Sequence, residues 1–239
     1  MKSKEGNFIL CSFLITFNYM LELHRGEENY LKAIYKLSQG KENVATRAIA
    51  QEMDTKDSSV TDMMKRLAKK ALIIHKPYYG ITMTEQGRLA ALTIIRRHRL
   101  WEVFMVDKLG FKWDEVHELA EQLEHIQSPL LLERLDKFLG YPAVDPHGDP
   151  IPDKDGKIVT KKHELLAEVP LDTHFRIVRV TDDSSDFLQY LDASGLNIGI
   201  HLEVKERISY DESLTLKLET GRKVHISEKV SKQILVVEP

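Results

Sequence analysis

Apolar side chains recur at helical spacing in three segments near the beginning of the chain. The first stripe starts at Tyr30 and Leu31, and Gly40 ends it. A polar turn separates the second segment from the third, and two short helices joined in this way are typical of a helix-turn-helix. The predicted helices cover residues 27–37, residues 47–53 with Thr46 as the cap, and a segment from Asp57 or Ser58 to about residue 70.

Two β-prone runs follow the third helix directly. They cover residues 72–76 and 81–84, with a turn at residues 77–80 between them. A hairpin in this place is a wing, so we expect residues 20–91 to form a winged helix-turn-helix. A long helix is predicted over about residues 85–109, directly after the second β-prone run.

The second half of the chain changes from helical to β-type patterning. A Pro-containing loop at residues 141–157 is the best domain boundary, so residues 92–157 are expected to be helical and residues 158–239 to form a small SH3-like β-barrel. The predicted class is therefore mostly α with β. The expected helices cover residues 113–126 and 128–139, and the expected strands residues 175–181, 199–206, 214–218, 223–226 and 233–237, with a helical insert at residues 185–191.

The composition shows that charge is distributed unevenly along the chain, and residues 1–19 need separate treatment. Residues 20–100 hold 15 Lys and Arg against 9 Asp and Glu, while residues 101–239 hold 17 against 27. A basic first part suits DNA and an acidic remainder suits cations, although an uneven solvated surface has the same pattern. The single Cys11 excludes a disulfide framework and fits a reducing cytoplasm. Residues 1–19 contain an apolar run that is too short to span a bilayer, and we interpret them as a disordered tail or a mis-started extension before Met20.

Hydroxyl and basic side chains gather where a helix-turn-helix meets DNA. The beginning of its second helix contacts base edges, and nearby cations bind phosphates. An alternative is that the first residues only cap the helix and the lysines are solvated. The candidate DNA-binding residues are Lys56, Ser58, Ser59, Thr61 and Lys65, with Lys76 and Tyr79 on the wing.

Imidazoles and carboxylates recur at helical spacing after the long helix. His117, Glu121, Glu124 and His125 fall within an arc of roughly 100° if the segment is one helix, and His98 and Glu102 form a further pair on the long helix. Helices that present such groups to each other build divalent-metal sites. The alternatives are salt-bridge decoration on an interaction or scaffold protein and a metal-dependent hydrolase. Because no H-E-x-x-H motif, P-loop or G-x-S-x-G elbow occurs, catalysis is disfavoured.

Five motifs resemble the diphtheria-toxin-repressor family of iron- and manganese-dependent transcriptional regulators. They are ENYLKAIY at residues 28–35, SSVT at 58–61, RHRL at 97–100, VHELAEQLEH at 116–125 and PHGDPIP at 146–152. The resemblance implies a homodimer that binds a palindromic operator in double-stranded DNA and represses metal-uptake genes. It implies no membrane and no small-molecule substrate. It also implies that residues 92–157 bind metal and dimerise, and that residues 158–239 are related to the ferrous-transport accessory module.

The resemblance also assigns ligands position by position. His98, Glu121, Glu124 and His125 match the effector site, whereas Glu102 and His117 match a second site, with a C-terminal ligand near Asp183 and a loop ligand at His147. Asp145 replaces a Cys found in related chains, and Asn29 stands where the first helix usually provides Asp or Met. Oxygen and imidazole donors favour Mn(II), with Fe(II) as the second choice.

Overall fold

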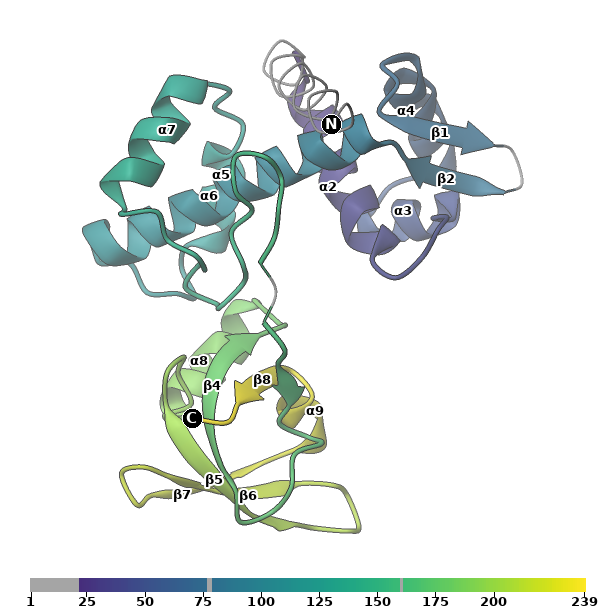
Figure 1. The fold of residues 1–239 in the computed structure, drawn as a ribbon. Coiled ribbons are helices and arrows are strands. Elements are labelled where there is room, and N and C mark those ends of the chain that lie inside the picture. The colour runs from purple at the N-terminus through teal and green to yellow at the C-terminus, as the bar shows by residue number, and fades with distance from the viewer. Residues whose placement is uncertain (1–21, 77–78, 160) are drawn as a thin grey trace, which may run out of the picture. The chain divides into compact units, whose positions relative to one another are not determined.

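The computed structural model describes residues 22–76, 79–159 and 161–239 (Figure 1). The predictions made for residues 1–19, and for Pro77 and Tyr78 in the wing turn, lie outside these residues. The described residues form two compact units, and the division falls inside the long helix, after His98. The first unit also contains Leu123–Arg134 and Pro152–Ile158, and the second contains Arg99–Gln122, Leu135–Ile151 and Val159–Pro239.

The first unit contains the predicted helix-turn-helix and wing. Its elements are α2 (Arg25–Ser38), α3 (Thr46–Glu52), α4 (Asp57–Lys69), β1 (Ile73–Lys76), β2 (Gly80–Met83) and the beginning of α5 (Glu85–Leu109). Strands β1 and β2 pair antiparallel, so the hairpin is confirmed. The apolar stripes of the helices meet in one core, which includes Leu31, Ile49 and Leu67.

Both predicted helix caps are wrong, by one residue for α3 and by one or two residues for α4. Thr46 is the first residue of α3, whose cap is Ala45, and Lys56 rather than Asp57 or Ser58 caps α4. Neither cap position has a side-chain hydrogen bond, so cap chemistry does not set these helix starts. The starts of α3 and α4 are set instead by burial of their apolar faces in the core.

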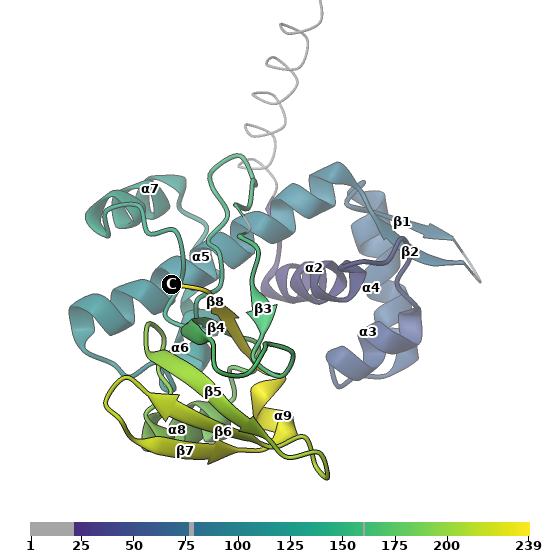
Figure 2. The same ribbon diagram turned by 60° about the horizontal axis from the view of Figure 1, so that its bottom comes forward.

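The second unit contains the end of α5, most of α6 (His117–Leu123), the end of α7 (Pro129–Phe138) and the C-terminal sheet. Within residues 161–239, six antiparallel strands are ordered β3-β8-β4-β5-β6-β7 (Figure 2). They are β3 (Glu164–Leu165), β4 (His174–Val180), β5 (His201–Arg207), β6 (Leu214–Leu218), β7 (Lys223–Ile226) and β8 (Ile234–Val237).

The predicted mostly α class with a C-terminal β domain is confirmed. The five predicted strands are present, and the sequence patterns missed β3 and the short helix α9 (Glu228–Ser231). The helical insert is α8 (Ser185–Ser194), whose C-cap is Gly195 with φ 76°. Alternating side chains of the sheet, such as Phe175 and Ile177 on β4, bury their apolar faces in a second core.

No helix among the described residues has both the length and the apolar character that a membrane span requires. The domain limits at residues 91/92 and 157/158 stay predictions.

Candidate functional site

A fully buried carboxylate, Glu124, lies at the centre of a polar cluster in the first unit. Its side chain is 0% exposed, and Lys32 on α2 donates to its Oε2 at 2.8 Å. The Nδ1 atom of His98 on α5 lies 2.6 Å from the same oxygen. Burial alone would raise the pKa of Glu124, but the hydrogen bond with His98 and the charge of Lys32 outweigh burial and hold the pKa below its ordinary value. Glu124 is therefore an anion in this cluster.

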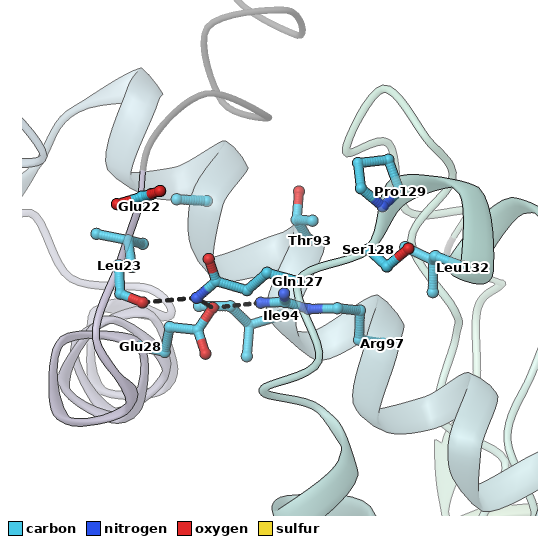
Figure 3. A pocket seen from close by; sticks show the side chains of 11 residues that line it. Glu22, Leu23, Glu28, Thr93, Ile94, Arg97, Gln127, Ser128, Pro129 and Leu132 are labelled. Carbon is cyan, nitrogen blue, oxygen red and sulfur yellow. Dashed lines mark hydrogen bonds and ion pairs between the residues drawn. The ribbon is translucent and has the colours of Figure 1, made fainter.

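A second buried carboxylate, Glu28 on α2, joins three elements of the same unit. It is 1% exposed, and Arg97 of α5 donates to its Oε1 at 2.5 Å. The Nδ1 atom of His125 lies 2.5 Å from its Oε2, and Gln127 donates to Oε1 at 3.0 Å. Figure 3 shows Glu28, Arg97 and Gln127 facing one another beside a cavity of about 310 Å³. Glu28 thus connects α2 to a predicted metal ligand.

Helix α6 is shorter than the sequence pattern predicted. It begins at His117 and ends at Leu123, so Glu124 and His125 lie in the following turn rather than on one face of a helix over residues 113–126. The side chains of both residues are held by tertiary contacts, which favour the turn over continued helix. Glu121 stays on the helix, with a half-exposed side chain 3.8 Å from His117.

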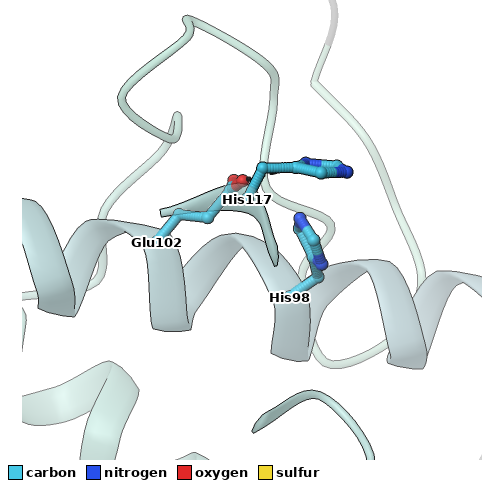
Figure 4. Close-up of side chains that lie close together, drawn as sticks. All are labelled: His98, Glu102 and His117. Atoms are coloured by element: carbon cyan, nitrogen blue, oxygen red, sulfur yellow. Dashed lines mark ion pairs between the residues drawn. The ribbon is translucent and has the colours of Figure 1, made fainter. Parts of the chain in front are cut away.

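Three buried groups of the second unit lie at metal-ligand spacing. Glu102, Asp145 and His147 each offer a ligand atom, and these atoms lie within 4.8 Å of one another. The Nδ1 atom of His117 lies 3.6 Å from Glu102 and 3.4 Å from Asp183. Figure 4 shows Glu102 beside His117, with His98 one turn earlier on α5. The structure therefore places His117 and His147 beside Glu102, and Asp183 beside His117, while their role as metal ligands stays a prediction.

The electrostatics of this second cluster favour a cation. Burial, together with the charges of Glu102 and Asp149, raises the pKa of Asp145 well above its ordinary value, and Arg99 only partly opposes this. The Nε2 atom of His147 lies 2.9 Å from the carbonyl oxygen of Trp113, which only accepts. If His147 is neutral, its proton is therefore on Nε2, and the lone pair of Nδ1 is available 3.9 Å from Glu102. A histidine bound to a metal through one nitrogen commonly donates the other to a carbonyl in this way.

The loop that carries His147 is fixed against the sheet. Gly148 has φ +87°, and a Cβ there would lie 2.0 Å from the carbonyl oxygen of Val178. The amide of Val180 donates to the carbonyl of His147 at 2.9 Å. His147 is therefore held in place by β4 and by the ring of Trp113, which stacks on it at 6.0 Å between centroids.

The predicted DNA-contacting residues lie on α4 and on the wing. Lys56, Ser58 and Ser59 are exposed at the beginning of α4, and Lys65 is exposed further along it beside Asp62. On the wing, Lys76 is exposed and Tyr79 is 77% exposed. Thr61 is half-buried and donates to the carbonyl of Asp57 at 2.9 Å, which leaves its oxygen only as an acceptor.

Three family models together match most of the chain. Residues 22–81 match the N-terminal DNA-binding domain of iron-dependent repressors, and residues 84–153 match their metal binding and dimerisation domain. Residues 165–238 match the FeoA domain. A solved structure described as a manganese-dependent transcriptional repressor in complex with manganese is 33% identical, with a TM-score of 0.79 over 89% of this chain and 100% of that chain.

The chain belongs to the iron-dependent repressor family. This family consists of metal-dependent, DNA-binding transcriptional repressors, and no comparison favours a scaffold protein or a hydrolase. The iron-dependent repressor IdeR of Mycobacterium tuberculosis is 35% identical over 133 residues, which are 56% of this chain and 58% of that protein, so the match spans less than two thirds of its length. The diphtheria toxin repressor of Corynebacterium diphtheriae is 26% identical over 230 residues, 92% of this chain and all of the repressor.

The sequence patterns did not reveal the contacts that α2 makes with the predicted metal ligands. Glu28 and Lys32 are one helical turn apart, and both contact predicted ligands, whereas the resemblance pointed only to Asn29 on this helix. A signal was available, because Glu28 is three residues before Leu31 and so lies on the apolar stripe of the helix. A charged side chain in such a stripe needs a buried partner.

Proposed function

We propose that this protein is a divalent-metal-responsive repressor that binds operator DNA as a homodimer in the cytoplasm and controls metal-uptake genes. Its matches to a DNA-binding domain and to a metal binding and dimerisation domain support this. The single observation that carries the metal response is the buried cluster of Glu102, Asp145 and His147, whose ligand atoms lie within 4.8 Å of one another. Burial and the neighbouring carboxylates raise the pKa of Asp145, which a bound cation would reverse.

The residues of both clusters fit a divalent cation by their chemistry. The first cluster would use His98, Glu124 and His125, and Glu121 on α6 stays a ligand predicted from the resemblance alone. The second would use Glu102, His117, Asp145, His147 and Asp183. When bound, the cation would offset the mutual repulsion of Glu102 and Asp145, which Arg99 offsets only in part. The protein's own groups orient the donors, since Trp113 holds the His147 ring and Arg99 holds Asp145 at 3.3 Å.

We propose Mn(II) as the effector, with Fe(II) as the second choice. Each donor named above is oxygen or imidazole nitrogen, and such donors suit Mn(II), whereas thiolate favours softer ions. Asp145, a hard oxygen donor, lies beside His147 in the second cluster. The similar solved structure that is described as complexed with manganese supports the same choice.

We propose that α4 enters the major groove and that the wing lies along the backbone. The serines at the start of α4 reach base edges, and the basic side chains neutralise phosphates. Since no side chain caps α4, the hydroxyls of Ser58 and Ser59 are not needed for that purpose. The residues assigned to DNA are Lys56, Ser58, Ser59, Thr61, Lys65, Lys76 and Tyr79.

Selection of DNA from a random duplex pool tests this function. Parallel selections with Mn(II), Fe(II) under anaerobic conditions, Zn(II) and a chelator should enrich one palindromic sequence with Mn(II), more weakly with Fe(II), and none with the chelator. Enrichment of the same sequence in the presence of chelator would contradict a metal-dependent repressor. Enrichment with Fe(II) alone would keep the family function and overturn the choice of manganese.

A further inference from the structure

A lysine of α2 contacts the most deeply buried carboxylate of the first cluster. The ammonium of Lys32 lies 2.6 Å from Oε1 and 2.8 Å from Oε2 of Glu124, so it faces both oxygens. The side chain of Lys32 is 20% exposed, whereas that of Glu124 is fully buried. The two residues are 92 positions apart, so this contact fastens α2 to the turn after α6.

The ammonium provides Glu124 with the charge that a metal ion would otherwise provide. A carboxylate that is removed from water is stable as an anion only beside a cation. Two cations that face the same pair of oxygens repel each other strongly where the surroundings are dry. Lys32 and a divalent ion therefore cannot both occupy this face of Glu124.

We propose that Lys32 is a tethered cation that competes with the metal ion for Glu124. It is a positioning residue, because it holds α2 against the turn after α6 when metal is absent. Metal binding displaces the Lys32 ammonium, so α2 loses its contact with Glu124 when the metal binds. This inference rests on the proposed metal response, in which Glu124 is a ligand.

A second contact keeps α2 attached when Lys32 is displaced. Glu28, one helical turn before Lys32, accepts from Arg97 at 2.5 Å, and this pair does not involve Glu124. Displacement of Lys32 therefore changes how α2 is held without detaching the helix. Because α2 packs against α3 and α4, the change reaches the helix-turn-helix.

A metal titration separates competition from ordinary stabilisation. Free Mn(II) is measured by its electron paramagnetic resonance signal in full-length protein with His147→Ala, which weakens the second cluster. Lys32→Met keeps the aliphatic stem and the helix propensity but removes the charge. We expect Lys32→Met to bind Mn(II) about tenfold more tightly, because the ion no longer displaces a charge-assisted hydrogen bond.

The matched control is Lys36→Met, one turn further along α2. Lys36 is exposed and pairs with Glu52 at 2.8 Å, so its removal should leave Mn(II) affinity unchanged. Equal or weaker Mn(II) binding by Lys32→Met would overturn the inference while leaving the proposed function intact. Failure of the His147→Ala parent and of the wild-type protein to bind Mn(II) would overturn both.

Thermal unfolding provides a second readout that a purely structural salt bridge would not reproduce. Without metal, Lys32→Met should unfold at a lower temperature than wild type, because Glu124 loses a partner. At saturating Mn(II) this difference should close. A deficit of the same size with and without Mn(II) would show that Lys32 only stabilises the fold and would contradict competition.

Discussion

Glu28 and Arg97 are two opposite charges that are both buried in the first unit, with side chains 2% and 8% exposed. Such a pair adds little to stability as a whole, because both ions lose their hydration. Removing one partner nevertheless lowers stability strongly, since the other charge then stays buried without a counter-charge. Arg97 already has a buried Nε atom without a hydrogen-bond partner.

Glu28→Ala should lower the free energy of unfolding by about 3 kcal/mol, because Arg97 then lacks its counter-charge. Urea denaturation without metal measures this change. Glu42→Ala is the control, since Glu42 is exposed and should change stability by less than about 0.5 kcal/mol. A loss of similar size in both variants would mean that Glu28 and Arg97 do not depend on each other.

Single residues were predicted from the sequence in so far as local spacing or a motif revealed them. The pair of His98 and Glu102, four positions apart on one helix, follows from periodicity. The role of His147 as a metal ligand was predicted only from the resemblance of the loop motif. The contact of Lys32 with Glu124 could not be predicted, because it depends on how two distant segments pack and leaves no periodic trace.

Elements were predicted more accurately than their ends. Helix α5 and the strands β6 and β7 have the predicted bounds, since their apolar patterns persist to the last residue. Helix α6 ends early because Glu124 and His125 are bound by side chains of other elements. Periodicity describes a helix as an isolated object, so it cannot detect contacts of this kind.

Helix α4 is predicted to contact DNA phosphates through Lys65. Lys65→Ala should weaken DNA binding equally across sequences and reduce the slope of log affinity against log salt by about 0.9, because one phosphate contact is lost. Fluorescence anisotropy at several salt concentrations measures the slope. Lys229→Ala in the short helix α9 is the control and should leave it unchanged. An unaltered slope for Lys65→Ala would remove this lysine from the phosphates.

The whole chain combines a DNA-binding unit and a β-sheet unit, each with its own apolar core. Their patterns differ in period, so the sequence predicted both architectures. The family match assigns metal binding and dimerisation to residues 84–153, a range that includes residues of both units. The central claim at this scale is that metal bound among these residues controls affinity for DNA.

Metal-dependent DNA binding by Glu124→Gln tests this claim most directly. The probe is the duplex selected with Mn(II), and the control is Glu118→Gln, an exposed position on α6. Wild type and Glu118→Gln should bind the duplex about tenfold or more tightly with Mn(II) than with chelator, whereas Glu124→Gln should lose this gain. Full Mn(II) stimulation of a folded Glu124→Gln protein would contradict the account.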